Sequence, residues 1–526
     1  MNRIHINQMG YRPHDPKKAV ITINAPNDDA GTDYKIVRVS DETVVYSGTA
    51  GEPVSDSASQ DTVRIADFSN FTEAGEYVVC SGALRSFPFV IGDNPYKGLR
   101  AALLEMFHYQ ICGVDLEYGV WSHPACHITP ATIYGTDKKK DVSGGWHDAG
   151  DYGRYIVPAA KTVADLLWAH KLAAHPDERL LDTVLFEIEW MLKMQDGESS
   201  GVYHKVSCAN FNALDEMPHD EQGELFLSPI SLTATADFAA SMALASRFYP
   251  AYKDTLLNAA QRAWNWCCAH PDAGGFTNPP GISTGPYGDD DGRDERFWAA
   301  CALFAATGDE TYHEYIKKCE LYTEECRTDI LFPFGLGWGN VETYGFMEYL
   351  LNAAYTTDDG VTRQMKDKLL NCCDIIMKSY AANPYGVSLG EVYRWGSNMT
   401  VANNAMMLIA GSRFTADSRA YTEAALEHFH YLLGRNPLSH SYITGFGYQF
   451  PHNPHHRPSA AKDSAVPGMV VGGPCMSVIR DPAINAHCPD APPAKRYVDH
   501  KESFASNEVA IYWNSPVYFV MAALGL

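Results

Sequence analysis

The sequence has no long apolar run and no recognisable targeting segment at its start. No stretch of the 526 residues approaches the ~20 consecutive apolar residues of a membrane-spanning helix, so we do not expect the chain to cross a membrane. The opening residues, MNRIHINQMGYRPHDP, have no apolar segment behind a basic start and no small-residue cleavage site. We therefore expect either a cytoplasmic protein or a secreted one from which a signal has been removed.

Positive charge is also scarce. The chain has 41 Lys and Arg against 64 Asp and Glu, a net charge of −23. This excess of negative charge would repel a nucleic-acid backbone or an anionic membrane surface, so a neutral or cationic partner fits better. The 30 Tyr, 22 Phe and 10 Trp supply flat apolar faces on which sugar rings can stack, although a large core needs such residues as well.

A disulfide framework is not expected. Thirteen cysteines is an odd number, and adjacent pairs such as Cys267-Cys268 and Cys372-Cys373 lie in helical patterns, where neighbours point to different faces. Most of these cysteines are expected to be small buried apolar residues.

The chain is predicted to form two domains. Up to about residue 92, short β-branched and aromatic runs alternate with turns rich in Asn, Asp, Gly and Pro, and the period-two alternation is clearest from Val63 to Phe71. This pattern predicts a small β-sandwich over residues 1–92. The period then becomes helical, with Leu99, Leu103 and Met106 on one side of a helix.

Residues 93–526 are predicted to be almost entirely helical. A dozen helices without a short repeat fit a closed double ring of helix pairs better than an open solenoid, which would need a repeat of ~30–45 residues. The expected helices cover about 95–112, 155–174, 179–195, 231–248, 254–270, 293–307, 309–322, 343–356, 362–380, 397–411, 418–434 and 507–525. The long irregular segments 113–154, 196–230, 271–292 and 435–506 would be loops at the rim of the ring, and loops of that length are usually functional.

The segment DVSGGWHDAGDYGRY places Asp148 and Asp151 three residues apart behind a Gly-Gly turn. Close like charges raise one pKa of a pair and make it a candidate for handling a proton or a water molecule. The alternative is an Asx-turn and a helix N-cap, since a helical pattern follows directly.

Four possible zinc ligands precede this pair. Two thiols and two imidazoles, from Cys112, Cys126, His127 and His147, form a complete tetrahedral set that leaves no open position for water, so a metal held by them would be structural. The alternative is buried cysteines and surface histidines.

Two further groups lie near the C-terminus. His455, His456 and Arg457 stand in a proline-bounded loop, where they could hydrogen-bond hydroxyl groups or form a surface cluster that offsets negative charge. Glu508 is expected at the start of the last helix, either as a capping residue or as a carboxyl whose pKa is raised by the apolar sequence behind it, as a general acid requires.

The whole chain resembles the bacterial family 9 glycoside hydrolases, cellulases with an immunoglobulin-like domain ahead of an (α/α)6 barrel. The blocks that carry the resemblance occur in the family's order: IHINQMGYRPHDPKKAVI, SGGWHDAGDYGRY, GVYHKV, ATADFAASMALASR, DERFWAA, WGSNM, LLGRNPLSHSYITGFG, NPHHR and NEVAIYWNSP. The resemblance implies an immunoglobulin-like sandwich over 1–92 and an all-α (α/α)6 barrel over 93–526.

The resemblance also implies roles for single residues. Asp151 matches the general base, Asp148 its partner in holding the water, and Glu508 the general acid. His455 and Arg457 match residues that hold the sugar beside the scissile bond, and the Cys112, Cys126, His127 and His147 set resembles a structural zinc site. Calcium is the second expected metal, with Asp290, Asp291, Asp294 and Glu295 as ligands, although GDDDGRDERFW departs from the family's pattern. Ser503 stands where some relatives have Asp, which could alter the pocket around Glu508.

An inverting glycosidase needs its two carboxyl groups ~6.5–9.5 Å apart, and we predict this separation for Asp151 and Glu508. The favoured activity is endo-hydrolysis of β-1,4-glucans such as cellulose or mixed-linkage glucan, by a monomer. An exo-acting enzyme that trims cello-oligosaccharides or glucosamine oligomers is the first alternative. A non-catalytic carbohydrate-binding protein and a zinc hydrolase with an open metal position are the others.

Overall fold

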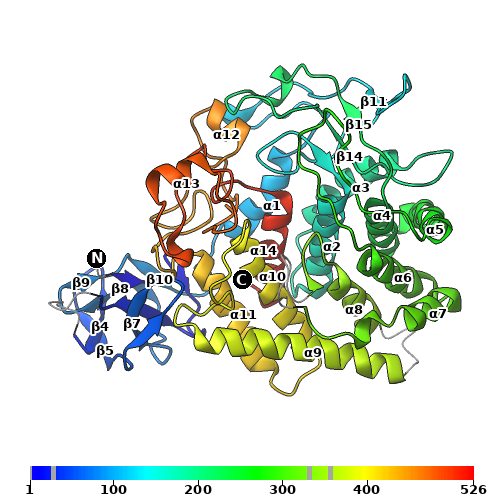
Figure 1. Ribbon diagram of the computed structural model, residues 1–526. Helices are drawn as coiled ribbons and strands as arrows, with labels where there is room; N and C mark the ends of the chain where they lie inside the picture. The colour runs from blue at the N-terminus through cyan, green and yellow to red at the C-terminus, as the bar shows by residue number, and fades with distance from the viewer. Residues whose placement is uncertain (1–2, 25–30, 328–334, 353–358) are drawn as a thin grey trace.

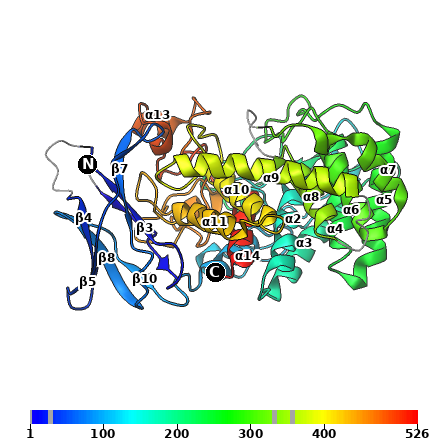
Figure 2. The same cartoon turned by 90° about the horizontal axis from the view of Figure 1, so that it is seen from below.

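The computed structural model describes residues 3–24, 31–327, 335–352 and 359–526. An all-β domain at the N-terminus lies beside a larger helical domain (Figures 1 and 2). Within the described ranges, no helix combines the length and the apolar character needed to cross a membrane.

The N-terminal domain is a β-sandwich, as predicted. One sheet has the order β1-β3-β7-β6 and the other β2-β10-β8-β4-β5, with β9 paired to β8. Alternating residues fill the space between the sheets: in β4, Tyr34 and Ile36 are buried while Asp33 and Lys35 are exposed. The strands are β1 (Ile4–His5), β2 (Gly10–Tyr11), β3 (Lys18–Thr22), β4 (Asp33–Arg38), β5 (Val44–Thr49), β6 (Val54–Asp56), β7 (Asp61–Asp67), β8 (Gly75–Ser81), β9 (Leu84–Arg85) and β10 (Phe89–Ile91).

Each predicted helical segment overlaps a helix, and the segments 293–307 and 397–411 have the same first and last residues as the observed helices. The end of the segment 343–356 lies outside the described residues. The long helices are α1 (Leu99–Tyr109), α2 (Ile156–Leu172), α3 (Arg179–Met194), α4 (Leu232–Ala245), α5 (Lys253–Ala269), α6 (Arg293–Thr307), α7 (Glu310–Cys319), α8 (Glu342–Leu350), α9 (Asp359–Ala382), α10 (Ser397–Gly411), α11 (Ser418–Leu432) and α14 (Ile511–Leu524). Two short helices, α12 (Arg457–Ala461) and α13 (Pro482–His487), were not predicted.

The helices differ in how completely they are buried. All residues of α4 are buried, as are nearly all of α2, α10 and α14, whereas α3, α5 and α7 bury one face only. Contacts run from α10 to α14, α14 to α2, α2 to α4, α4 to α6 and α6 to α8. The one-sided helices pack outside these buried ones, α3 on α2, α5 on α4 and α7 on α6 (Figure 1).

The near absence of strands after residue 92 is the first expectation that the structure corrects. Among the described residues of this domain, five short strands form a third sheet, of order β12-β11-β15-β14-β13. They are β11 (Ala131–Ile133), β12 (Lys139–Lys140), β13 (Arg154–Tyr155), β14 (Lys205–Ser207) and β15 (Phe226–Leu227). Strands of two or three residues are too short to show alternation, and this sheet joins two of the predicted rim loops.

One disulfide is present, between Cys326 and Cys372. The other eleven cysteines are free, so the expectation of mostly unpaired cysteines holds for all but this pair. Cys372 and its neighbour Cys373 point to different faces of α9, as the helical pattern requires: the first is bonded to Cys326 and the second donates to the carbonyl of Met407.

The two domains are joined by buried polar contacts. Asn7 bonds His430 in α11 over 2.8 Å, and His5 bonds Ser439 over 2.7 Å. Asp61 in β7 forms a 2.6 Å ion pair with Lys495. Since removal of one partner would leave another polar group buried and unpaired, these contacts fix the sandwich on the helical domain.

Candidate active site

A cavity of about 630 Å³ opens where the rim loops meet the buried helices. All four of the predicted rim loops have residues in the wall, and so do the segments around Trp338, Trp395 and Glu508. The wall is formed by Asp148, Ala149, Asp151, Tyr155, Phe211, Gly285, Pro286, Tyr287, Gly288, Trp338, Trp395, Met399, His455, Arg457, Arg480, Phe504, Glu508, Tyr512 and Trp513. The loop 113–154 contributes Asp148, 196–230 contributes Phe211, 271–292 contributes Tyr287, and 435–506 contributes His455.

Asp148 and Asp151 lie together on this wall, with 1% and 7% of their surface exposed. One Asp151 oxygen accepts hydrogen bonds from the Tyr155 hydroxyl at 2.9 Å and from the Gly153 N–H at 3.1 Å. Asp148 accepts a bond from the Tyr287 hydroxyl, and its second oxygen has no partner among the residues that the structure describes. The bond to Gly153 is the Asx-turn that the sequence allowed, but neither aspartate caps α2, whose N-cap is Tyr155.

Glu508 is not at the start of a helix, contrary to the sequence expectation. The last helix begins at Ile511, and residues before it are extended: Glu508 pairs with His455 and Val509 pairs with Val471. Because this segment pairs with two others, it cannot enter the helix that the apolar sequence predicted. Glu508 therefore reaches the cavity from an extended segment, and the capping alternative is wrong.

The three carboxyl groups differ electrostatically. Burial raises the pKa of Glu508 well above its usual range, and the nearby Asp151 raises it further. Burial also raises the pKa of Asp151, but the Arg457 guanidinium, the Tyr155 hydroxyl and the Gly153 N–H all oppose that rise. Arg457 and the Gly150 N–H also lower the pKa of Glu508, but that pKa stays well above its usual range, so Glu508 suits an acid. The three groups around Asp151 suit it to a base.

Residues 455–457 join the aspartate turn to the segment that carries Glu508. The His455 N–H donates to the carbonyl of Asn507 at 2.8 Å, and the Arg457 guanidinium donates to the carbonyl of Gly150 at 2.7 Å. Gly150 allows this close approach, because a Cβ there would lie 2.1 Å from the His455 carbonyl oxygen. One short segment thus holds both sides of the cavity.

The structure divides the His-His-Arg group. His455 and Arg457 line the cavity, whereas His456 is 1% exposed and points into the protein, where it bonds Gln110 over 3.0 Å. Arg457 also lies 5.7 Å from the ring centre of Phe211. The alternative of a surface cluster is therefore wrong for His456 and Arg457, both of which are buried.

Aromatic rings form much of the remaining wall. Trp338 contacts Tyr287 edge-on at 5.1 Å between ring centres, and Trp395 contacts Phe504 in the same way at 5.7 Å. Flat apolar rings between polar groups provide the kind of surface on which sugar rings stack while their hydroxyls bond side chains.

Cys112, Cys126, His127 and His147 form a group that can hold a metal ion, with ligand atoms within 4.8 Å of one another. The two sulfurs are 3.9 Å apart, each sulfur lies 3.6–3.7 Å from an imidazole nitrogen, and the two nitrogens are 3.4 Å apart. His127 also bonds the Glu221 carboxylate through its other nitrogen at 2.8 Å. All four ligand residues point inward, so the alternative of surface histidines is wrong.

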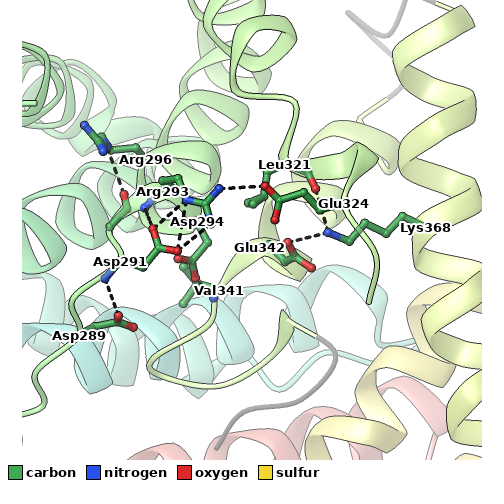
Figure 3. Close-up of polar contacts among 11 residues, drawn as sticks. Asp289, Asp291, Arg293, Asp294, Arg296, Leu321, Glu324, Val341, Glu342 and Lys368 are labelled. Atoms are coloured by element: carbon green, nitrogen blue, oxygen red, sulfur yellow. Dashed lines mark hydrogen bonds and ion pairs between the residues drawn. The ribbon is translucent and has the colours of Figure 1, made fainter. Parts of the chain in front are cut away.

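The acidic residues proposed for calcium do not come together in the same way. In the part of the chain that the structure describes, the Cys/His group alone has three or more such ligand atoms within 4.8 Å. Asp290 is exposed, and Asp291 is paired with Arg293 at 2.9 Å, which in turn bonds Glu324 (Figure 3). Asp294 accepts the Val341 N–H at 2.7 Å, and both oxygens of the buried Glu295 lack a protein partner within the described ranges.

The sequence analysis did not identify Tyr155 and Tyr287, which bond the two aspartates. Tyr155 is the last residue of the sequence block SGGWHDAGDYGRY that contains Asp151, so its position could have indicated a role in the site. Tyr287 lies in a distant loop, and no sequence pattern indicated it. Ser503 is buried and bonds Asp481 at 3.1 Å, so it supports the Glu508 segment and does not line the cavity.

Comparison with known proteins follows the same division of the chain. Residues 96–521 match Glycosyl hydrolase family 9, and residues 1–86 match the Cellulase N-terminal ig-like domain. A cellodextrinase of Butyrivibrio fibrisolvens is 34% identical, with 100% of each chain covered. The crystal structure of a single mutant of a thermostable endoglucanase from Alicyclobacillus acidocaldarius is 37% identical with a TM-score of 0.89, covering 99% of both chains. A Zn-binding triple mutant of the family 9 endoglucanase J30 is 31% identical with a TM-score of 0.89, covering 98% of this chain and 99% of that one.

Proposed function

The chain belongs to glycosyl hydrolase family 9, and we propose that Asp151 is its general base, Glu508 its general acid and Asp148 a second ligand of the attacking water. The enzyme is a glycoside hydrolase that cleaves β-1,4-glucans with inversion. The observation that carries the proposed roles is that all three carboxyl groups line one cavity, where three groups favour the ionised form of Asp151 while the pKa of Glu508 is raised well above its usual range.

In this mechanism, Asp151 removes a proton from a water molecule as that water attacks the anomeric carbon. Glu508 donates its proton to the departing oxygen, so a new C–O bond forms as the glycosidic C–O bond breaks. The free oxygen of Asp148 provides a second acceptor for the water. His455 and Arg457 would hold the sugar next to the scissile bond, and inversion converts a β-link into an α-anomer.

The test is the configuration of the first product, followed by NMR during hydrolysis of a cellopentaose-type oligomer. We expect the α-anomer first, and Asp151→Ala and Glu508→Ala should each lower kcat by at least about a thousandfold. A β-anomer as first product would contradict inversion. Full activity of either variant would instead show that other groups act as the acid or the base.

Endo-hydrolysis of β-1,4-glucan polymers is the activity that we favour, because the similarity to the structure of an endoglucanase extends over 99% of both chains. Exo-trimming of short cello-oligosaccharides is the second candidate, since the cellodextrinase relative matches over 100% of both chains. Viscosity measured together with reducing-sugar release separates them. An early fall in viscosity supports endo cleavage, whereas sugar release at constant viscosity supports exo cleavage.

We propose that the metal of the Cys/His group is zinc. A tetrahedral zinc ion with Zn–S of about 2.3 Å and Zn–N of about 2.0 Å needs ligand atoms about 3.3–3.8 Å apart. Four of the six separations among the ligand atoms are 3.4–3.9 Å, which fits this geometry, and all six are within 4.8 Å. When bound, zinc would crosslink the end of α1 to the loop ahead of Asp148, and four protein ligands leave no position for catalysis, unlike a zinc hydrolase.

Asp294 and Glu295 are the two buried residues of the acidic set, and we propose only these two as calcium ligands. Elemental analysis of the purified protein tests both metals at once: one zinc per chain supports the Cys/His site. Retention of calcium in the wild type and its loss in Glu295→Gln would support a calcium site at Asp294 and Glu295.

We further propose that the helical domain is an (α/α)6 barrel and that it begins at about residue 93. The neighbour contacts of α10, α14, α2, α4, α6 and α8, with other helices packed outside them, support the barrel. The gap between the end of β10 at Ile91 and the start of α1 at Leu99 supports the boundary. We also propose a monomer, which sedimentation velocity would test.

A further inference from the structure

Gln110 lies directly behind the aspartate turn, at the C-terminal end of α1, and is 1% exposed. Its side-chain nitrogen donates to the carbonyl of His147 at 3.1 Å and to the carbonyl of Ala149 at 2.9 Å. Its own backbone carbonyl accepts the His147 N–H at 2.7 Å. One side chain therefore holds the backbone on both sides of Asp148.

The other end of the Gln110 amide meets His456. Both carbonyls can only accept, so the amide NH2 must face them and Gln110 Oε1 must face His456. His456 Nε2 lies 3.0 Å from that oxygen, and therefore carries a proton and donates it. His456 Nδ1 then accepts from the Ser459 hydroxyl at 2.8 Å. Burial lowers the pKa of His456 to about 3, in agreement with this neutral form.

His456 stands between the two residues that face the cavity, His455 and Arg457. The chain from Gln110 through His456 thus connects the turn of Asp148 and Asp151 to the segment that pairs with Glu508. Neither Gln110 nor His456 lines the cavity.

We propose that Gln110 is a positioning residue for glycoside hydrolysis: through its bonds to the carbonyls of His147 and Ala149 and to His456, it fixes the aspartate turn relative to the His455–Arg457 segment. This inference rests on the proposed roles of Asp148, Asp151 and Glu508. A misplacement of about 1 Å in reacting groups can lower a rate by about a hundredfold. Binding of the sugar by the cavity wall depends much less on that distance.

The test compares Gln110→Leu with a matched variant, Gln195→Leu. Gln195 is also buried and also donates to two carbonyls, those of Ser200 and Ala259 at 3.0 and 3.1 Å, but it does not line the cavity. Each variant removes two side-chain hydrogen bonds to backbone carbonyls, so similar losses of stability are expected. We expect kcat on a cellopentaose-type oligomer to fall about tenfold to a hundredfold in Gln110→Leu alone, with KM within about twofold of wild type.

A second variant keeps the inference testable if Gln110→Leu does not fold. Gln110→Glu retains the oxygen that faces His456 and loses the NH2 donor, and we expect the same fall in kcat with zinc content unchanged. In the His456 series, His456→Gln keeps a donor towards Gln110 and should retain more activity than His456→Leu.

Three outcomes would overturn the inference: an unchanged kcat in both Gln110 variants, an equal fall in Gln195→Leu, or a fall that follows loss of zinc. Asp151→Ala in the same assay separates this inference from the proposed function. If Asp151→Ala is inactive while the Gln110 variants are fully active, the positioning role fails and the base assignment stands. If Asp151→Ala stays active, the proposed function itself fails.

Discussion

The hydrogen bond from Tyr155 to Asp151 permits a direct test of which carboxyl group acts as the base. Tyr155→Phe removes one hydroxyl from a buried ring and leaves the ring in place. The 2.9 Å bond from that hydroxyl favours the ionised form of Asp151. Its removal should raise the pKa of Asp151 and leave Glu508, which does not contact Tyr155 through an observed hydrogen bond, essentially as it is.

The size of the shift follows from the strength of the bond. A hydrogen bond to a charged group contributes about 1.5–3 kcal/mol, and one pKa unit corresponds to about 1.36 kcal/mol. The loss therefore amounts to about 1–2 units. The Gly153 N–H and the charge of Arg457 still favour the ionised Asp151, while Glu221 opposes it, so we expect the lower value, about 1 unit.

The assay is the pH dependence of kcat/KM on a defined oligomer. A base must be ionised, so activity falls as pH drops through the pKa of Asp151, and that acid limb should move up by about 1 unit in Tyr155→Phe. The alkaline limb, where Glu508 loses its proton, should not move. Tyr344→Phe is the matched control, since its hydroxyl donates to Asp165 at 2.5 Å and it does not line the cavity. An unmoved acid limb, or a shift of the alkaline limb alone, would refute the assignment.

Three further predictions concern stability and geometry. Chelation of zinc, or Cys126→Ser, should lower Tm before it lowers kcat at a temperature well below Tm; a loss of activity at unchanged Tm would instead indicate a catalytic metal. Lys161→Met should lower the free energy of unfolding in urea by about 3–5 kcal/mol, because it removes the Lys161 ammonium that lies 2.6 Å from the buried Asp165 carboxylate. Breaking the exposed Arg419–Glu423 pair should lower it by less than about 1 kcal/mol. Equal losses in the two variants would contradict this. Gly150→Ala should lower kcat more than Gly197→Ala, since a Cβ at Gly150 would meet the His455 carbonyl at 2.1 Å and one at Gly197 meets nothing within 4 Å; equal rates would show that the close approach is not needed.

The helices were predictable because each repeats its apolar residues over several turns. The segment 397–411 has the same bounds as α10, and the segment 155–174 exceeds α2, Ile156–Leu172, by one residue at its start and two at its end. The alternation in the first domain was readable for the same reason, since one face of each sheet meets a core. The strands β11–β15 were missed because two or three residues show no period, and their pairing joins segments far apart in the sequence.

The candidate site shows where such reasoning ends. Sequence blocks identified Asp148, Asp151, His455, Arg457 and Glu508, and all five line the cavity. The location of Glu508 ahead of the last helix was missed, because an apolar helical pattern does not show where tertiary pairing holds the chain extended.

The residues that support the site were missed for another reason. Gln110 and Tyr287 contact the aspartate turn from other segments, and a single glutamine or tyrosine has no spacing that would reveal them. Cys326 and Cys372 likewise lie 46 residues apart, and the number of cysteines gives no indication of which two meet.

The connection of α14 to α2 has a consequence for how the enzyme acquires its activity. Asp151 precedes Glu508 by more than three hundred and fifty residues, and the last helix packs against α1, α2 and α10. During synthesis on the ribosome, the chain therefore contains Asp151 long before it contains Glu508. During refolding, hydrolysis would begin only after the C-terminal helix has docked. The time at which activity appears would therefore report when this long-range step of folding is complete.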